Sequence, residues 1–280
     1  MKLPRQALVW GLALALAGGC ALAQKQGDAQ YAPTVGQAGK DVIWVPTPPE
    51  LVEKMLRMAK ITPEDFIIDL GSGDGRIAIA AAKKFGARAQ GIEYNPDMVA
   101  LSNRDARRQG VADRVRFVKA DIFQSDFSQA TIITMYLLPD LNVKLRPRIL
   151  ELKPGTRVVS HQFGMEEWQP EERAEIDNRL AYLWIVPAKV GGTWSLRAEG
   201  SGQDRELTLR QSFQLLSGQL KAGAAALELA EAKLRGDEIR FTVVEAGVRH
   251  DFSGRVRGTT MDGTVRSAGA PVSRWFASRR

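Results

Sequence analysis

Strand and helix patterns alternate along the first half of the chain. Phe66–Leu70 has the composition of a buried strand, whereas Pro49–Lys60 and Arg76–Phe85 repeat apolar residues at helical spacing. Further strands are expected over residues 87–93, 115–119, 131–136 and 156–162. A helix should begin after Asn95, and another should cover residues 139–152 with a break at Pro147. This alternation predicts a Rossmann-like α/β unit on a mainly parallel sheet.

The pattern changes after about residue 187. Short alternating runs, separated by glycine-containing turns, follow at residues 206–213, 239–245, 251–257 and 263–266. They predict a small antiparallel β barrel or sandwich, whose core should take up the aromatic residues Trp194, Phe213, Phe241, Phe252 and Trp275. Two runs at the junction fit two arrangements. In the first, Leu180–Val186 and Thr193–Leu196 together close the first sheet as a hairpin. In the second, Thr193–Leu196 is the first strand of the β domain.

The amino terminus has the features of a signal peptide. Lys2 and Arg5 precede an apolar stretch, and Ala21-Leu22-Ala23 fits signal peptidase cleavage after Ala23. A lipoprotein modified at Cys20 and an uncleaved anchor are the alternatives, although the stretch is short for a membrane span. The expected organisation is a signal peptide (1–23), a flexible leader (24–42), an α/β domain (43–188) and a β domain (189–280). The body should be periplasmic or secreted.

Charge and cysteine content narrow the chemistry further. The net charge of +7 suits nucleic acid, an anionic membrane or an acidic partner, but the arginines are spread along the chain. Signal peptide removal would take away Cys20, the only cysteine, which leaves no disulfide, cysteine nucleophile or cysteine-bound metal. No histidine and carboxylate cluster has ligand spacing either, so no metal site is expected.

A glycine-rich loop follows the first buried strand in the run Asp69-Leu70-Gly71-Ser72-Gly73-Asp74-Gly75. Glycines there let the backbone approach a ligand, and the start of the next helix offers free N–H groups. A dinucleotide loop would place its third glycine one position later, where this chain has Arg76. The loop therefore favours a ligand without a diphosphate; a tight turn without any ligand is the alternative.

Two acids follow the next two strands. Glu93 ends the second strand, where a carboxylate can accept both hydroxyls of a ribose. Asp121 follows the third strand and is placed to accept a hydrogen bond from an adenine amino group, with Ile122 beside the ring. A solvated strand-end charge at Glu93 and a turn cap at Asp121 are the plainer alternatives.

The glycine loop and these two acids, in this order, resemble the class I S-adenosylmethionine (SAM)-dependent methyltransferase family over residues 43–186. The resemblance implies that Gly71 and Gly73 face the methionine part of SAM, that Glu93 holds the ribose and that Asp121 reads the adenine. The residues assigned to the cofactor are Asp69, Gly71, Ser72, Gly73, Gly75, Glu93, Asp121 and Ile122.

Within that family the chain is most similar to the small lysine methyltransferases that act on the adenine-nucleotide translocase and the ATP-synthase c-subunit. The shared segments are Val45–Pro48, Asp69–Arg76 and Leu152–Val158. This similarity implies methyl transfer to a protein lysine, with a small molecule as the alternative acceptor. The signal peptide and the β domain lie outside the pattern.

The acceptor side should lie after the fourth and fifth strands, where we expect Tyr136 and His161 to be catalytic. Tyr136 can orient an amine, or it can simply pack under a loop. His161 at a strand end is either catalytic or structural, and His250 is expected to be structural. The Asn/Asp-Pro-Pro-Tyr signature of enzymes that methylate nucleic-acid amino groups is absent, so no nucleic-acid partner is expected.

A second function class also fits the sequence. A catalytically weak SAM-fold module that binds partners through its β domain would suit an exported protein, since SAM is made in the cytoplasm. The intact loop, Glu93 and Asp121 favour the enzyme. Arginines of the β domain could meet an anionic membrane or an acidic protein, or be only solvated: Arg249, Arg255, Arg257, Arg266 and Arg274. The sequence does not determine the oligomeric state.

Overall fold

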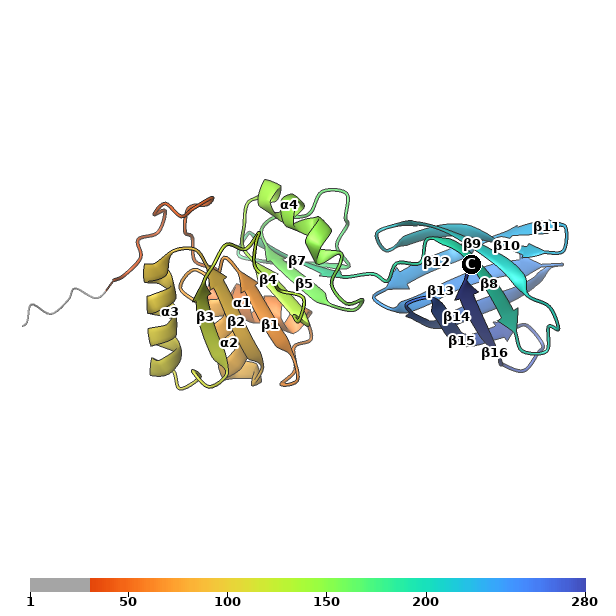
Figure 1. Ribbon diagram of the computed structural model, residues 1–280, viewed down its shortest axis with the longest axis horizontal. Helices are drawn as coiled ribbons and strands as arrows, with labels where there is room; N and C mark the ends of the chain where they lie inside the picture. Colours follow the sequence, from red (N-terminus) through yellow and green to blue (C-terminus); the bar gives the residue numbers. More distant parts are fainter. Residues whose placement is uncertain (1–30) are drawn as a thin grey trace, which may run out of the picture. The chain divides into compact units, whose positions relative to one another are not determined.

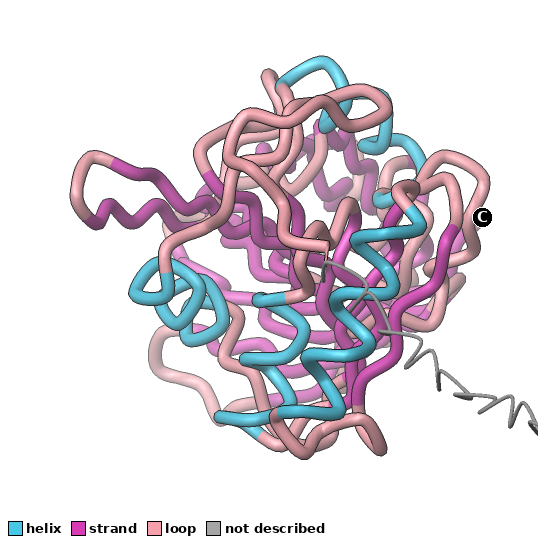
Figure 2. Tube along the Cα trace, turned by 90° about the vertical axis from the view of Figure 1, so that its left-hand side faces the viewer, coloured by secondary structure: helices cyan, strands magenta, loops and turns pink. Residues whose placement is uncertain are grey.

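The structure is a computed structural model that describes residues 31–280, and residues 32–280 form one compact unit. The expected signal peptide, including Cys20, lies outside the described residues. Within the described part of the chain, no helix is long and apolar enough to cross a membrane. Figure 2 shows the helices and strands along the chain.

The α/β part contains four helices and seven strands among the described residues (Figure 1). The helices are α1 (Pro49–Met58), α2 (Arg76–Phe85), α3 (Pro96–Arg108) and α4 (Pro139–Ile149). The strands are β1 (Phe66–Leu70), β2 (Arg88–Glu93), β3 (Val115–Lys119), β4 (Ile132–Met135), β5 (Arg157–His161), β6 (Glu172–Ile176) and β7 (Arg179–Ile185).

These strands form one sheet in the order β3-β2-β1-β4-β5-β7-β6. Strands β1 to β5 pair in parallel, whereas β7 runs antiparallel to β5 and β6 runs antiparallel to β7. The strand order reverses between β1 and β4, which are neighbours in the sheet. Ligands of open α/β sheets bind at such a reversal, outside the carboxyl ends of the strands.

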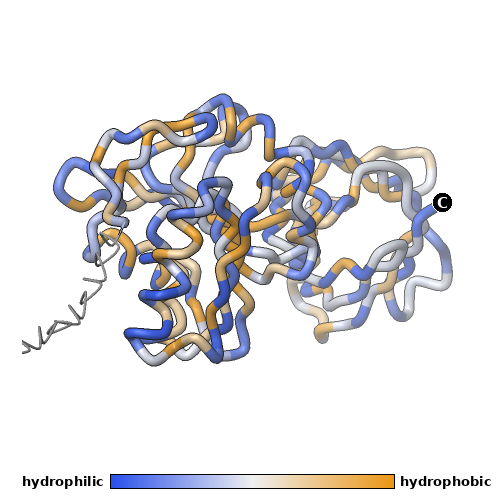
Figure 3. Tube along the Cα trace, turned by 60° about the vertical axis from the view of Figure 1, so that its left-hand side comes forward, coloured by the Kyte–Doolittle hydropathy of each residue, from blue (hydrophilic) through white to orange (hydrophobic). Residues whose placement is uncertain are grey.

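Alternating side chains of the strands supply two hydrophobic cores, one on each face of the sheet. Ile67 of β1 belongs to the core formed with α1 and α2, whereas the next residue, Ile68, packs in the core that includes Leu145 and Ile149 of α4. Figure 3 shows hydrophilic and hydrophobic positions alternating along the helices, as expected for helices with one face on a sheet. The predicted Rossmann-like sheet is confirmed.

Helix α4 corrects one expectation. The sequence predicts a break at Pro147, but the helix continues through this residue to Ile149. Proline removes only one backbone hydrogen bond, the one donated to the residue four positions earlier. Because the helix ends two residues later, little of it depends on that bond, and the buried Leu145 and Ile149 hold the last turn against the sheet.

The second part is a closed antiparallel β barrel, which confirms the barrel of the two predicted alternatives. Its strands are β8 (Gly192–Ala198), β9 (Arg205–Ser212), β10 (Leu215–Ala222), β12 (Ala230–Arg235), β13 (Glu238–Glu245), β14 (Val248–Arg257), β15 (Thr260–Ser267) and β16 (Ser273–Arg279). Pairing of β10 with β9 closes the ring, and β11 (Ala225–Glu228) adds to β10. Residues 193–196 therefore belong to the barrel, while β6 and β7 form the hairpin that ends the first sheet.

Aromatic side chains fill the barrel interior. Phe241 and Phe252 stack with ring centroids 4.7 Å apart, and Trp275 meets each of them edge-on at 5.9 Å. Trp194 is fully buried in the same core. Phe213, expected in this core, is instead stacked on Trp168 of the α/β part at 5.9 Å, because it lies in the turn between β9 and β10. The barrel interior is thus packed with side chains.

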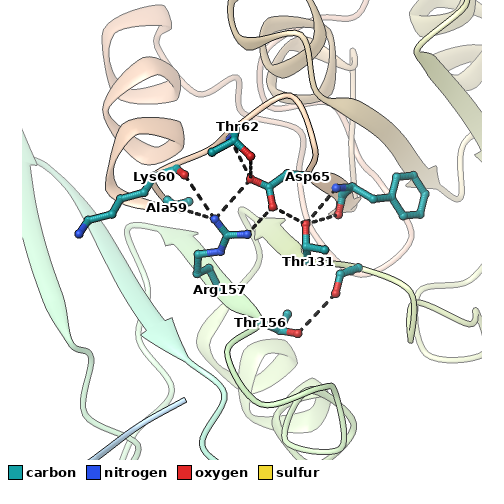
Figure 4. Close-up of polar contacts among 9 residues, drawn as sticks. Ala59, Lys60, Thr62, Asp65, Thr131, Thr156 and Arg157 are labelled. Carbon is teal, nitrogen blue, oxygen red and sulfur yellow. Dashed lines mark hydrogen bonds and ion pairs between the residues drawn. The ribbon is translucent and has the colours of Figure 1, made fainter. Parts of the chain in front are cut away.

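An ion pair at the start of β1 fixes the sheet edge opposite to the strand carboxyl ends (Figure 4). The Asp65 carboxylate is 4% exposed and accepts hydrogen bonds from Arg157, from the Thr131 hydroxyl and from the Thr62 backbone N–H. Arg157 also donates to the carbonyl of Ala59 at the end of α1. This cluster connects the beginnings of β1, β4 and β5 with the end of α1.

Arg157→Met should therefore cost about 2–4 kcal/mol of unfolding free energy, because it leaves a buried carboxylate short of hydrogen bonds. Burial alone would raise the pKa of Asp65, but hydrogen bonds from Thr131, Arg157 and Thr62 outweigh it and hold the pKa below 3.8. The stabilisation is consequently present above pH 3.8 and is lost as the pH falls through the lowered pKa. Urea denaturation at pH 7 and at lower pH measures both effects.

The matched control is Arg57→Met, which removes an exposed arginine paired with Glu53 within α1. It should change the unfolding free energy by less than about 1 kcal/mol. Equal costs for the two substitutions would contradict the importance of the Asp65 cluster.

Candidate active site

A cavity of about 720 Å³ opens at the carboxyl edge of the sheet, where the strand order reverses. The glycine loop after β1, the end of β2, the residues after β3 and the segment between β4 and α4 all contribute to its wall. Its volume is in the range of small-molecule and cofactor sites. The predicted residues Asp69, Gly71, Ser72, Gly73, Glu93, Asp121, Ile122 and Tyr136 all line it.

The glycine loop reverses the chain in very little space. Gly73 has φ +53°, and a Cβ there would lie 2.7 Å from Trp44 Nε1. Gly75 has φ +79°, and its Cβ would lie 2.5 Å from the Phe117 ring. A side chain at either position would strain the backbone, because φ is positive, and would clash with the neighbouring ring. Gly75, predicted to bind the cofactor, is placed against Phe117 and the start of α2 instead.

Glu93 holds the loop through its carboxylate. Oε2 accepts a hydrogen bond from the Gly73 backbone N–H at 2.9 Å, and Oε1 accepts one from the Asn95 backbone N–H at 2.9 Å. Each carboxylate oxygen has more than one lone pair, so both can also accept from a ribose hydroxyl. Glu93 is thus fixed in position before any ligand arrives.

Asp121 lies on the same wall, but its carboxylate already has partners. Oδ1 accepts from the Phe123 backbone N–H at 2.8 Å, and Oδ2 accepts from Lys40 Nζ at 2.7 Å. The Lys40 hydrogen bond, with that from Phe123, lowers the pKa of Asp121 below its usual value. Lys40 Nζ also lies 4.9 Å from the ring centroid of Tyr94, the residue after Glu93. Ile122 completes this end of the cavity.

Two buried polar atoms by the loop have no hydrogen-bond partner within the described part of the chain: Asp69 Oδ2 and Ser72 Oγ. The other Asp69 oxygen accepts from the Thr134 hydroxyl at 2.7 Å. Burial, together with the charges of Asp74 and Glu93, raises the pKa of Asp69 to about 7 despite the hydrogen bond from Thr134. Unsatisfied buried polar groups are costly. Both residues line the cavity, so their unpaired oxygens fit a polar, positively charged ligand such as the methionine part of SAM.

The acceptor side carries Tyr136 in the cavity wall and His161 next to it. The two rings are in contact, with centroids 3.8 Å apart and planes tilted by 35°, and Tyr136 also stacks on the Phe163 ring at 6.3 Å. His161 is 0% exposed and shares a 3.0 Å hydrogen bond with the Thr47 hydroxyl through Nδ1. Burial lowers the pKa of His161 to about 4, with help from the Arg179 charge, so the ring is neutral at pH 7.

Half of the lining residues that the sequence did not predict come from residues 37–47 before α1. The leader expected to be flexible over residues 24–42 contains Lys40, which reaches Asp121. Trp44 covers Gly73, and the Thr47 carbonyl accepts from Arg76 Nη1 at 2.9 Å. Thr47 lies in the Val45–Pro48 segment, which the sequence analysis used only as evidence of the family and not to place residues in the site. Nothing in the sequence around Lys40 predicts its place in the site, since its partner Asp121 lies 81 residues away.

This fold, with an acid at the end of β2 and a glycine loop at the strand reversal, is that of a class I SAM-dependent methyltransferase. The chain matches the family model of the ANTKMT methyltransferase domain over residues 69–172. It is 42% identical over 151 residues to a protein-lysine N-methyltransferase of Saccharolobus islandicus, covering 52% of this chain and 94% of that protein. The chain therefore belongs to this methyltransferase family.

Two further similarities extend this result. The adenine nucleotide translocase lysine N-methyltransferase of Mus musculus is 33% identical over 152 residues, a match that covers 54% of this chain but only 61% of that protein. The crystal structure of an RNA methyltransferase from Salinibacter ruber in complex with S-adenosyl-L-homocysteine (SAH) is 47% identical, with a TM-score of 0.51. That match covers 52% of this chain and 96% of the other. SAM is the cofactor of this enzyme, as predicted.

Binding of SAM should release a proton near neutral pH. Because the pKa of Asp69 is raised to about 7, this carboxyl is partly protonated in the empty site at pH 7. A cationic ligand beside it favours the charged form and lowers its pKa, so the affinity for SAM should rise as the pH increases through 7. Calorimetry at pH 7 in buffers of different ionisation enthalpy measures the released proton, about half of one per site. Asp69→Asn should abolish this release; an unchanged release in the variant would assign the proton to another group.

Proposed function

We propose that this enzyme methylates a lysine amine of a protein. The observation that carries the proposal is the composition of the cavity wall after β4 and β5. Beside the glycine loop, this wall consists of apolar side chains and one hydroxyl group, from Tyr136, Leu137, Leu138, Leu141 and Phe163. Such a wall suits the uncharged form of an amine at the end of a long aliphatic chain.

The chemistry explains why an apolar wall helps. The sulfonium of SAM supplies an electrophilic methyl group and a neutral leaving group. A free lysine has a pKa of about 10.4, so it is an ammonium group at neutral pH. It must lose a proton before the nitrogen can attack. Apolar surroundings such as Leu137, Leu138 and Phe163 disfavour the ammonium form. The Tyr136 hydroxyl can accept an N–H hydrogen bond and direct the nitrogen lone pair toward the methyl group.

We assign His161 a positioning role, because it is fully buried. Its neutral ring supports one face of Tyr136, and its hydrogen bond to Thr47 connects β5 with the segment before α1. Both contacts hold residues that line the cavity. His161 therefore acts on the reaction through Tyr136 and Thr47.

The similar proteins support two acceptor classes. Two relatives carry the name of lysine methyltransferases, one acting on protein lysine and one on the adenine nucleotide translocase. The Salinibacter ruber protein carries the name of an RNA methyltransferase. From the end of β4 this chain reads Met135-Tyr136-Leu137-Leu138-Pro139-Asp140, which does not contain the Asn/Asp-Pro-Pro-Tyr signature. We therefore favour a protein lysine over RNA.

Tyr136→Phe should reduce the turnover of a lysine-containing acceptor by roughly 10- to 100-fold, because the amine loses its hydrogen-bond acceptor. The affinity for SAH should stay unchanged, since the ring and its contacts with His161 and Phe163 remain. Tyr182→Phe, on β7 beside Trp184, is the matched control and should leave turnover unaffected. A Tyr136→Phe variant with full turnover would contradict the orienting role.

We propose that the acceptor lies in the cell envelope and that the enzyme is periplasmic, after removal of residues 1–23. We assign residues 43–188 to methyl transfer and residues 189–280 to selection of the partner. An anionic membrane is not our choice of partner, because three of the barrel arginines are paired locally. Arg249 pairs with Glu231, Arg255 with Asp237, and Arg257 with Asp262.

Two measurements test the location and the acceptor together. Intact mass of the envelope-fraction protein should show a chain that begins at Gln24; a lipid on Cys20 or a full-length cytoplasmic chain would contradict cleavage and export, respectively. The same protein, incubated with an envelope extract and methyl-labelled SAM, should transfer label to protein as methyl-lysine. Label removed by ribonuclease would favour RNA, label in small molecules would favour the alternative acceptor, and SAM binding without any transfer would favour the binding module.

A further inference from the structure

Residues 34–44 form a hairpin on the cavity. The Gly36 N–H donates to the Trp44 carbonyl and the Trp44 N–H donates to the Gln37 carbonyl, both at 2.9 Å. The turn is closed by a 2.9 Å hydrogen bond from the Gly39 N–H to the Val42 carbonyl. Residues 37–44 all line the cavity, so this hairpin is a wall of the cofactor site rather than a detached leader.

The tip of the hairpin carries Lys40, whose ammonium group has two partners on the sheet side. Its Nζ donates to Asp121 Oδ2 at 2.7 Å and lies over the Tyr94 ring at 4.9 Å from the centroid. The second Asp121 oxygen accepts from the Phe123 backbone N–H. Asp41, next along the hairpin, is 3.8 Å from Nζ. The ammonium group thus engages the acid and the aromatic face together.

An adenine ring would need the same two partners. Its amino group is an N–H donor for a carboxylate, and its π face stacks on an aromatic ring. A lysine ammonium is also an N–H donor, and it binds aromatic faces through cation–π attraction. The two groups are therefore chemical substitutes for one another at Asp121 and Tyr94. Because Lys40 Nζ lies 2.7 Å from Oδ2 and 4.9 Å from the Tyr94 centroid, an adenine that contacts both partners would have to displace it.

We propose that Lys40 sets cofactor affinity by competing with the adenine for Asp121 and Tyr94, so that the hairpin must release Lys40 for SAM or SAH to bind fully. This inference rests on the placement of adenine at Asp121 in the proposed site. Both the substrate SAM and the product SAH carry adenine, so the return of Lys40 to Asp121 also assists product release. The hairpin then serves exchange of cofactor and not the methyl transfer itself.

Binding measurements on the mature chain test this competition. Lys40→Met should bind SAH about three- to tenfold more tightly than the wild type, because an ion pair and a cation–π contact no longer have to be broken. The same gain should appear with 5′-methylthioadenosine, which lacks the amino-acid half of SAH. Raising the salt concentration from about 50 to about 500 mM should tighten wild-type binding, since salt screens the Lys40–Asp121 pair, and should leave Lys40→Met unchanged.

Lys84→Met is the matched control, because Lys84 forms a similar exposed ion pair with Glu53 at 2.6 Å away from the cavity. It should not alter either affinity. Unchanged or weaker binding by a folded Lys40→Met protein would overturn the proposal. Asp121→Asn should weaken SAH binding and cancel the gain from Lys40→Met. If it does neither, Asp121 does not bind adenine, and the proposal for Lys40 fails together with that assignment. The proposed lysine methylation is measured separately and would not be affected by this result.

Discussion

The close approach of the glycine loop to β2 and β3 is the constraint on which the site depends. A Cβ at Gly91 of β2 would lie 2.3 Å from the Phe117 ring and 2.5 Å from Ser72 Oγ. The loop can therefore lie directly against the sheet only because this strand position has no side chain. The Phe117 ring occupies the space that a side chain at Gly91 would need, and it leaves no room for one at Gly75 either. This packing brings Gly73 within reach of Glu93, and it leaves the Ser72 hydroxyl buried at the cavity.

Electrostatics at this loop follow from the same packing. Asp69, Asp74 and Glu93 lie close enough together for their charges to raise the pKa of Asp69. Asp74 is paired with Arg76, at 2.5 Å, and Glu93 accepts hydrogen bonds from two backbone N–H groups. Of these three acids, only Asp69 has a buried oxygen without a hydrogen-bond partner in the described part of the chain. The site is therefore arranged to favour a cation at one place, which suits a cofactor that carries positive charge.

Local sequence patterns were sufficient to predict the sheet and the acids at its carboxyl edge that line the cavity. Each strand is a short apolar run, and Asp69, Glu93 and Asp121 each follow a strand that can be recognised by itself. Parallel strands then bring the three acids to one edge. The hairpin of residues 34–44 could not be predicted in this way, since its composition is polar and glycine-rich. It is held by Lys40, whose partner Asp121 lies 81 residues away.

The same distinction explains the other differences. Thr47 and His161 are 114 residues apart, so their hydrogen bond could not be read from either local pattern. Phe213 was expected in the barrel because it is aromatic and follows a strand, yet its turn position directs it to Trp168. Local patterns determine which face of an element is apolar, but not which distant surface covers it.

The packed interior of the barrel limits how that part of the chain can act. Its core is formed by apolar and aromatic side chains such as Trp194, Phe241 and Trp275, so the partner selection proposed for it would have to use the outer surface. One outer groove of about 450 Å³ is lined by Arg197, Asp204, Arg274 and Phe276, and the Phe276 side chain is 49% exposed. Arg197 is already paired with Asp204 there. A partner of the barrel would therefore gain more from contact with the exposed aromatic ring than from net charge, which fits a folded protein surface better than a simple polyanion.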